Sequence, residues 1–413
     1  MRASCIFLFV SCLFAQGPHQ IQDIRFDGVG RTGADILSAR LLIKTGKTYS
    51  DKQLEQAAAR IARLPFIHNA YYELETAADG SVTLVIAVEE NRMFTGQVGT
   101  SWSRWDGSGQ TQSSDQFVAR GTFFVGKSMA VGITARPDMT WTQEHESQSS
   151  YDVGLTHYNL FGTPFTATAG VEVQEDRNPD FFGNSYWYQY DNEPTWSFAL
   201  ELPFAGNNRV HGRYLSGGGD SEILASINGE LWTQKDNFSA VGVGWEYSTA
   251  NDELEPDSGM VISADVYSNK FKQDEVQGPS LPYSSERDHT TFTAGFKQYH
   301  PYRSRGVFYY EAAAGQVEDN FSYSDGSDTI VVPDRYDGRY VRAELGNRWH
   351  LWGDDLTSRV GDLRLTVAAF GMHSRLDGRD GDAEGTSYGG RAGLSLRNEW
   401  GRVNLGYQYT SFD

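Results

Sequence analysis

The side chains best placed to do chemistry are charged residues that alternate with apolar ones. In a β-strand successive side chains point to opposite faces, so such charges gather on one face and the apolar residues on the other. A polar face of this kind can line a water-filled interior or bind polar ligands. The residues predicted to face such an interior are Glu172, Glu201, Glu246, Arg364 and Arg397. Those predicted on the opposite, lipid-facing side are Val171, Leu200, Val243, Leu365 and Leu396.

Enzymatic chemistry is not predicted. The sequence has no Gly-x-Ser-x-Gly motif, and its nine histidines lack metal-ligand spacing such as His-x-x-x-His. The acidic segment 376–385, LDGRDGDAEG, weakly resembles a calcium loop, but Asp/Gly clusters are ordinary turn chemistry and a solvated loop is the preferred interpretation. We therefore predict no catalytic residues, no cofactor and no metal.

Composition restricts the class of protein further. The 413-residue chain has 54 acidic and 35 basic residues, a net charge of −19, which argues against a nucleic-acid partner. No apolar run of the roughly 20 residues that a membrane-spanning helix needs lies beyond the N-terminus. The mature chain is then either soluble or crosses a membrane as a closed barrel, because hydrocarbon satisfies no unpaired backbone group.

Residues 1–15 are predicted to be a signal peptide. Arg2 precedes the apolar stretch 5–14, and Ala15 is a small residue at the expected cleavage point. A lipoprotein signal ending at Cys12 is the weaker alternative. Both cysteines, Cys5 and Cys12, lie in this segment, so the mature chain is expected to contain no thiol.

Residues 19–91 are predicted to form a small domain in the order β-α-α-β-β. A strand at 21–26 precedes a helix near 34–42, and Ser50 with Gln53 makes a capping box for a second helix. A hairpin of segments 68–76 and 81–90 closes the domain.

Residues 94–413 alternate with a period of two, which indicates β-strands. A soluble β-sandwich would also alternate. Segments of about 10 residues, a second face rich in charged residues and glycine, and alternating short and long connections are instead typical of a transmembrane β-barrel. The segments number roughly fifteen. Since bacterial single-chain barrels normally have even counts, we expect about 16 strands, with one either overlooked in 222–234 or missing after the final YQYTSFD.

The first domain resembles a polypeptide-transport-associated (POTRA) domain. The resemblance rests on IQDIRFDGVGRT at the start, KTGKTYSDKQLEQAAARIARLPFIHNAYYELE in the middle and VTLVIAVEEN at the end. With the barrel that follows, the chain resembles a single-POTRA member of the BamA/TamA superfamily of outer-membrane assembly and translocation proteins. That resemblance implies a mainly β fold in the outer membrane, with the POTRA domain in the periplasm.

The family's functional motif is poorly matched. Members carry an Arg-Gly-aromatic tip in the sixth outer loop, whose Arg pairs with an acidic residue inside the barrel. Here the corresponding region, about 319–339, offers only Arg335, Gly338, Arg339 and Tyr340, and Ala369 stands where the acid is expected.

The resemblance implies a non-enzymatic factor that inserts or translocates polypeptides. Its partners would be unfolded outer-membrane or exported polypeptides, outer-membrane lipids and accessory lipoproteins. The alternative is a structural or passive-pore barrel that has lost this activity, which the weak motif favours.

Overall fold

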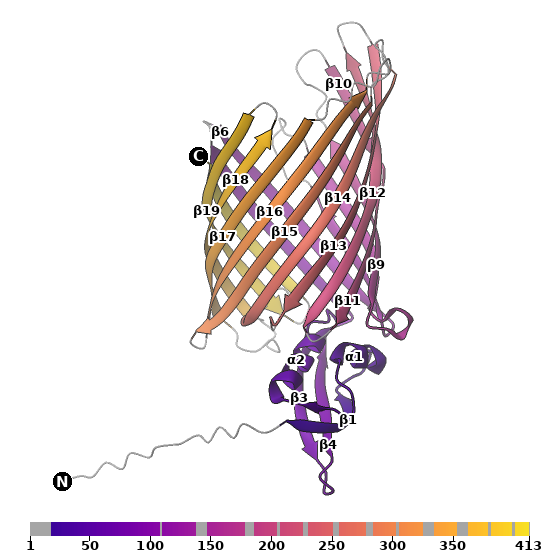
Figure 1. The fold of residues 1–413 in the computed structure, drawn as a ribbon, viewed down its shortest axis with the longest axis vertical. Helices are drawn as coiled ribbons and strands as arrows, with labels where there is room; N and C mark the ends of the chain where they lie inside the picture. Colours follow the sequence, from indigo (N-terminus) through magenta and orange to yellow (C-terminus); the bar gives the residue numbers. More distant parts are fainter. Residues whose placement is uncertain are drawn as a thin grey trace, which may run out of the picture.

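A computed structural model of the chain shows a small N-terminal domain attached to one end of a long β-barrel (Figure 1). It describes residues 18–107, 110–137, 147–177, 186–204, 207–225, 230–250, 256–277, 284–302, 305–324, 334–352, 362–378, 381–398 and 401–412. The predicted signal peptide, residues 1–15, lies outside these ranges. We call the end of the barrel next to the N-terminal domain the proximal end and the other the distal end.

The N-terminal domain has the predicted β-α-α-β-β order, with one very short strand added between the helices. Its sheet has the order β2-β1-β4-β3, in which β1 runs parallel to β4, and β3 forms an edge. The elements are β1 (His19–Asp27), α1 (Ala34–Leu41), β2 (Thr48–Tyr49), α2 (Asp51–Ala62), β3 (Ile67–Thr76) and β4 (Val82–Glu90).

Aliphatic side chains from both helices and the sheet form the domain's core. Leu37 of α1, Leu54 and Ile61 of α2, and Leu84 and Ile86 of β4 are all at most 1% exposed. The predicted capping box begins α2, because the side chains of Ser50 and Gln53 bond the amides left free in its first turn. The helices are therefore held against one face of the sheet.

The barrel consists of long, tilted antiparallel strands. Five consecutive strands are 19 residues long, about twice the predicted length. The strands are β5 (Phe94–Gly107), β6 (Gln110–Val125), β7 (Met129–Arg136), β8 (Ser147–His157), β9 (Thr166–Arg177), β10 (Tyr186–Asn192), β11 (Thr195–Phe204), β12 (Asn208–Ala225), β13 (Glu230–Ser248), β14 (Gly259–Gln277), β15 (Ser284–Tyr302), β16 (Gly306–Ser324), β17 (Asp334–Trp352), β18 (Asp362–Gly378), β19 (Gly381–Asn398) and β20 (Gly401–Phe412).

The barrel wall has 15 strands, the number of segments counted in the sequence and one fewer than the even count of about 16 that we expected. The sheet includes 16 labelled strands, but β10 and β11 pair with successive stretches of β12 and share one position in the wall. The described residues of 222–234 belong to the end of β12 and the start of β13, so they hold no additional strand.

An odd number of strands fixes how the ring closes. Antiparallel neighbours alternate in direction, so the first and last of 15 run the same way and must pair in parallel. β20 pairs with β5 in this manner, from Gly401 opposite Gly96 to Ser411 opposite Asp106. We call this parallel β5–β20 pair the seam.

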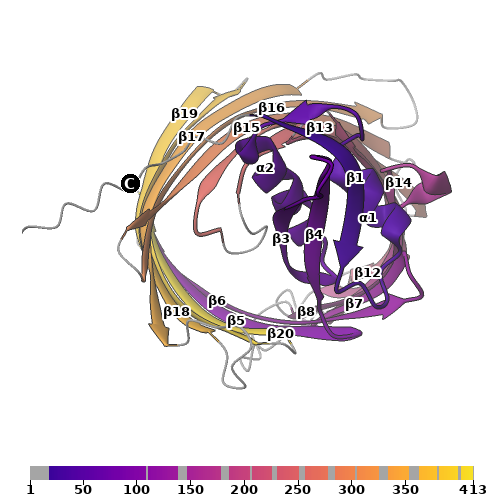
Figure 2. The ribbon, with the colours of Figure 1, turned by 90° about the horizontal axis from the view of Figure 1, so that it is seen from below.

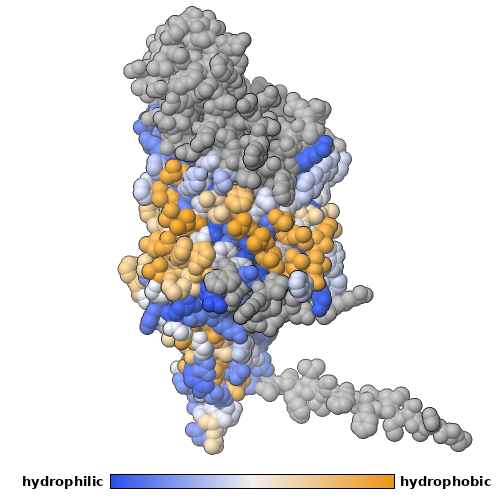
Figure 3. Space-filling model, turned by 180° about the vertical axis from the view of Figure 1, so that it is seen from behind, coloured by the Kyte–Doolittle hydropathy of each residue, from blue (hydrophilic) through white to orange (hydrophobic). Residues whose placement is uncertain are grey.

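The outer surface of the barrel is apolar. Val243 is 61% exposed and Leu200 52% exposed, and exposed apolar side chains recur at alternate positions around the wall. On the face seen in Figure 3 they form an apolar band, with hydrophilic residues below it. An apolar band of this kind is what a bilayer requires of a barrel's exterior. Among the described residues, no helix is both long and apolar enough to cross a membrane.

The N-terminal domain lies beneath the proximal opening. Viewed along the barrel from the domain side, it covers the part of the ring near β7, β12, β13 and β14 (Figure 2). Both helices lie against the barrel, while the β3–β4 hairpin points away from it (Figure 1).

Candidate functional site at the domain–barrel junction

Three arginines of the N-terminal domain point toward the barrel. Arg40 lies in the last turn of α1 and Arg60 in the last turn of α2, and Arg63 is the C-cap residue of α2. A cation near a helix C-terminus is stabilised by the negative end of the helix dipole. The two helices thus bring three guanidinium groups to the proximal opening.

Arg40 begins a chain of ion pairs that continues into the barrel wall. Its guanidinium lies 3.3 Å from the Glu201 carboxylate and also donates to the Thr166 hydroxyl. Arg209 bridges the same Glu201, at 3.4 Å, and Glu246, at 2.8 Å. The result is an alternating row of charges, Arg40–Glu201–Arg209–Glu246, that ties α1 to β11, β12 and β13.

Arg60 bonds only uncharged acceptors. It donates to the Leu41 carbonyl at 2.6 Å, the Arg40 carbonyl at 3.3 Å and the Asn207 side-chain oxygen at 3.2 Å. Burial, together with the nearby charge of Arg63, lowers the pKa of Arg60 to about 10. The group is still protonated at neutral pH, so a positive charge whose described acceptors are all uncharged is held at the junction.

Two further groups of contacts fix the domain to the barrel. The Asn159 amide donates to Asp35 at 2.7 Å, and the Gly33 amide donates to the Lys127 carbonyl at 3.3 Å. Phe66 packs edge-on against Phe124 and Tyr158, with ring centroids 5.8 and 5.1 Å away. These contacts join the start of α1, and Phe66 after α2, to the proximal ends of β6 and β8.

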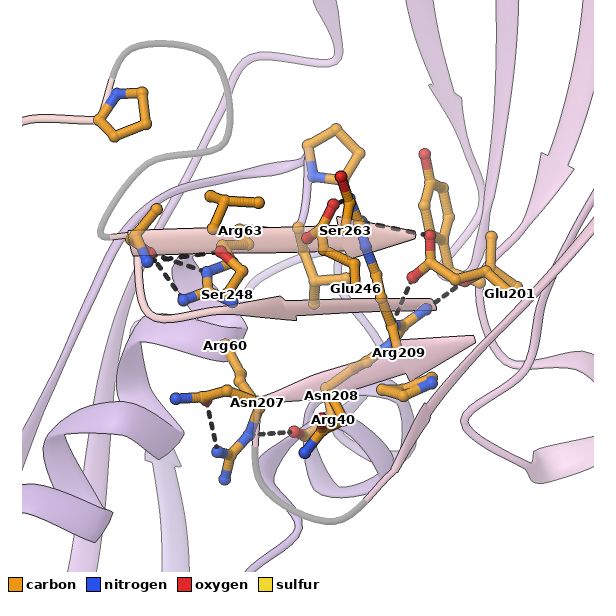
Figure 4. Close-up of a pocket in the computed structure, with 18 of the residues that line it drawn as sticks. Arg40, Arg60, Arg63, Glu201, Asn207, Asn208, Arg209, Glu246, Ser248 and Ser263 are labelled. Atoms are coloured by element: carbon orange, nitrogen blue, oxygen red, sulfur yellow. Dashed lines mark hydrogen bonds and ion pairs between the residues drawn. The ribbon is translucent and has the colours of Figure 1, made fainter. Parts of the chain in front are cut away.

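A cavity of about 650 Å³ lies between the domain and the barrel interior. Figure 4 shows Arg40, Arg60 and Arg63 on one side of it, with Glu201, Arg209 and Glu246 on the strands opposite. Asp265 and Lys297 add to the polar lining. A cavity lined by side chains of both charge signs suits a hydrated polar ligand better than a compact apolar one.

The residues predicted to face the interior all lie in polar surroundings, although they do not form one cluster. Glu201 and Glu246 line the cavity, and Glu172 pairs with Arg136 at 3.3 Å. Arg364 pairs with Asp362 at 2.5 Å and with Asp257 at 3.1 Å. Arg397 lies beside a second cavity near the seam.

The candidate sixth-loop residues are in a strand. Arg335, Gly338, Arg339 and Tyr340 all lie in β17, where Arg339 pairs with Gln316 of β16, and the connecting segment 325–333 is outside the described residues. The candidate calcium segment likewise belongs to the ends of β18 and β19 apart from 379–380, and no group of three or more potential metal ligands occurs in the described part of the chain.

The barrel wall contains a buried acid that was not predicted from the sequence. Glu344 of β17 is 1% exposed; it accepts a hydrogen bond from the Tyr309 hydroxyl at 3.0 Å and pairs with Arg342, at 3.0 Å, and with Arg391. Arg342, Glu344 and Arg348 occupy alternate positions between apolar residues, and this pattern is the signal that could have identified the cluster.

Comparison with known families identifies the N-terminal domain. The POTRA family model, described as a surface antigen variable number repeat, matches residues 19–91. No curated protein matches the chain.

Several solved structures have a similar overall course of the chain. BamA from Haemophilus ducreyi lacking POTRA domains 1–3 is 13% identical, with a TM-score of 0.39, over 94% of this chain and 80% of that one. CdiB from Acinetobacter baumannii is 10% identical, with a TM-score of 0.44, over 96% and 74%. CdiB from Escherichia coli is 12% identical, with a TM-score of 0.42, over 91% and 72%.

The chain therefore joins one POTRA domain to a β-barrel of the outer-membrane type. This is the architecture that the sequence led us to expect.

Proposed function

We propose that this protein is a non-enzymatic factor of the outer membrane that assembles or translocates polypeptides, with its POTRA domain in the periplasm. The observation that carries the proposal is the parallel seam between β5 and β20. Its clients would be unfolded outer-membrane or exported polypeptides.

The directions of β5 and β20 allow one more strand to pair between them. Both β5 and β20 run from the proximal to the distal end, so a single strand inserted between them in the opposite direction would be antiparallel to each. The wall would then contain an even number of strands, and every neighbouring pair would be antiparallel. Parallel pairs are slightly less stable per residue, so the exchange replaces one weaker pair with two stronger ones.

The POTRA domain supplies a place where a client could first bind. β3 pairs only with β4 and leaves one edge of the sheet open. An extended chain can add to such an edge through main-chain hydrogen bonds that demand little of its sequence. The docked helices keep this sheet close to the proximal opening.

A disulfide across the seam tests the proposal. A Cβ atom built on Gly99 would lie 3.7 Å from the Asn404 Cβ, within the range of about 3.5–4.5 Å that disulfides need. We expect the oxidised Gly99→Cys/Asn404→Cys protein to fail in assembling a small unfolded outer-membrane barrel into vesicles, and reduction to restore the activity.

The control is a disulfide elsewhere in the wall. His373 and Thr386 stand opposite each other on β18 and β19, with the imidazole Nδ1 3.3 Å from the hydroxyl oxygen, so His373→Cys/Thr386→Cys should also oxidise but leave assembly intact. Full activity of the oxidised seam variant would contradict the proposal. If the wild-type protein assembles no client and gives a steady conductance in a planar bilayer, the passive-pore alternative holds instead.

A further inference from the structure

The connection between β8 and β9 is a short turn at the proximal end of the barrel. β8 ends at His157 and β9 begins at Thr166, and one turn of 3-10 helix, Leu160–Gly162, lies between them. In Figure 1 this connection is the loop below β9, level with the proximal ends of the strands, and it extends outward past the wall. We call residues 158–165 the β8–β9 turn.

Phe161, at the tip of the β8–β9 turn, is the most exposed of the large apolar side chains described. It is 92% exposed, whereas the next most exposed, Met93, Val243 and Trp352, reach 61%. A phenylalanine left in water to this extent forgoes the large gain in free energy that burying its ring would bring. The exposure indicates that a medium other than water covers the ring.

The backbone holds Phe161 in a conformation that side chains rarely adopt. Its φ of 57° and ψ of 30° lie in the left-handed region, which one other non-glycine residue among those described shares. Such a conformation persists only where the surrounding structure enforces it. Here the Leu160 amide donates to the Phe165 carbonyl at 3.0 Å, and the Gly162 amide donates to the Asn159 carbonyl at 3.2 Å. The turn is therefore built to present this side chain.

The inner side of the β8–β9 turn is held by the POTRA domain. Asn159 is 5% exposed, and its side-chain amide donates to Asp35 of α1 at 2.7 Å. The ring of Tyr158 packs against Phe66, with the centroids 5.1 Å apart. Since the domain occupies the inner side, the exposed ring of Phe161 lies on the outer side of the turn.

The wall beside the outer side of the turn is apolar. Phe165 is 37% exposed and faces outward, because its neighbour Thr166 lines the cavity at the domain–barrel junction. Leu155 and Val153 of β8 are 44% and 47% exposed. Phe161 thus continues the lipid-facing surface past the ends of the strands, at the level where lipid headgroups meet the acyl chains. Aromatic residues are enriched at this level in membrane barrels.

We propose that the β8–β9 turn is a membrane anchor, which inserts the ring of Phe161 into the interfacial region of the lipid leaflet at the proximal end. The ring lies among the upper acyl segments, and the polar backbone of the turn stays in the hydrated headgroup region. A groove on a partner protein is disfavoured, because the apolar surface that Phe161 continues is the one that lipid covers. The inference requires only that the barrel lies in a bilayer, so it does not depend on the proposed function.

The test places an environment-sensitive dye at the tip of the turn. With both Cys5 and Cys12 replaced by serine, Phe161→Cys supplies the single thiol of the full-length chain for labelling with NBD. The protein is folded into vesicles of phosphatidylethanolamine and phosphatidylglycerol, with or without a lipid that carries a nitroxide quencher on its acyl chain. We expect the emission to be blue-shifted, and to be quenched more by a nitroxide near the headgroup than by one near the end of the chain.

Three control positions carry the same dye. Val243→Cys lies within the apolar band and should be quenched more by the deeper nitroxide. Asp79→Cys lies in the turn of the β3–β4 hairpin, which points away from the barrel, and should show neither a blue shift nor quenching (Figure 1). Lys127→Cys lies in the neighbouring β6–β7 turn, but the Lys127 Cβ faces the domain, 3.6 Å from a Cβ built on Gly33. It should be quenched less than Phe161→Cys.

Each labelled variant is first shown to fold by circular dichroism, so a lack of quenching cannot be attributed to misfolding. Emission typical of water, without quenching, at position 161 would overturn the inference. Equal quenching at positions 127 and 161 would also overturn it, because a dye on any proximal turn would then give the result. If the dye at 161 is shielded only after a periplasmic extract is added, the turn binds a protein and not the bilayer, and the inference is again overturned.

Discussion

In the POTRA domain, the large side chains that are fully buried are all aliphatic, from Ile21 to Ile86. In the described part of the barrel, the one large side chain buried to the same degree is that of Glu344. Outside, the relation is reversed: the barrel exposes Leu345 and Val341 at 59% each. The two regions use the same amino-acid types for opposite faces. What differs is the solvent, since the domain buries apolar surface away from water and the barrel turns it toward lipid.

The largest loss of stability is expected from changing Glu344, the buried acid of the barrel. In Glu344→Gln the partly exposed guanidinium groups of Arg342 and Arg391 lose the buried carboxylate between them, and each of these two hydrogen bonds to a charged group is worth about 1.5–3 kcal/mol. The free energy of unfolding should fall by an amount of this order in guanidinium titrations followed by tryptophan fluorescence. This signal reports the barrel alone, because the first of the ten tryptophans is Trp102.

The control for this change is Glu384→Gln. Glu384 is 66% exposed and pairs with His373 at 3.2 Å, so its loss should cost about 0–1 kcal/mol. Similar losses in the two variants would mean that the buried cluster contributes no more than a surface pair.

A leucine truncation should affect the two regions unequally. Leu54→Ala opens a cavity in the POTRA core, where the side chain is 0% exposed, and should cost about 2–5 kcal/mol. Leu345→Ala changes a side chain that faces lipid, whose tails fill the space, so the cavity contribution is absent and a smaller loss, that of the transfer free energy alone, is expected. Circular dichroism at 222 nm follows the domain over the denaturant range in which tryptophan fluorescence shows the barrel still folded, because α1 and α2 are the α-helices among the described residues. Equal losses would show that the outer barrel surface is packed like a core.

The orientation of the wall can be tested with one pair of adjacent residues. Val367 is 42% exposed on the outside of β18, and Thr366 precedes it on the opposite face. Val367→Arg should lower folding stability in vesicles by about 2–4 kcal/mol, the cost of arginine near mid-bilayer, while Thr366→Arg should have a much smaller effect. Equal folding yields would contradict the register of β18.

Most elements of the POTRA domain could be predicted from the sequence, because the signals for them are local. The Ser50–Gln53 capping box and the helical spacing after it predict α2, and the turn at Asp79-Gly80 predicts the hairpin. In the barrel, the period of two predicts strands equally well. Their length was underestimated, because polar extensions such as the start of β17 continue the ladder without the apolar pattern.

The closure of the ring and the junction were not predictable in the same way. Whether β20 pairs with β5 depends on the number and direction of all the intervening strands, so no local sequence pattern predicts this pairing. Arg40 and Arg60 look like ordinary helix-end cations in the sequence. Their meeting with Glu201 and Asn207 depends on where the domain docks, more than 140 residues away along the chain in both cases.

The smallest expected effect is a pH-dependent one within the domain. Glu90, at the end of β4, accepts hydrogen bonds from the backbone amides of Arg31 and Thr32 at 3.0 and 2.7 Å. Burial raises the pKa of Glu90, but the bonds from Thr32, the amide of Arg31 and the charge of Arg31 outweigh it, so the pKa lies below its ordinary value of 4.5. Glu90 thereby holds the segment that leads into α1 and the junction.

Because the folded-state pKa is depressed, the stabilisation from Glu90 is fully present above the unfolded pKa and is lost as the pH falls through the folded one. Glu90→Gln should therefore lower the stability of the domain by about 1–3 kcal/mol at pH 7, the value of hydrogen bonds to a charged acceptor. The difference from wild type should shrink steadily below pH 4.5. Denaturant titrations at 222 nm between pH 7 and strongly acidic conditions measure it, and tryptophan fluorescence serves as the internal control for the barrel. A difference that stays constant over this range would mean that Glu90 contributes through its shape and not its charge.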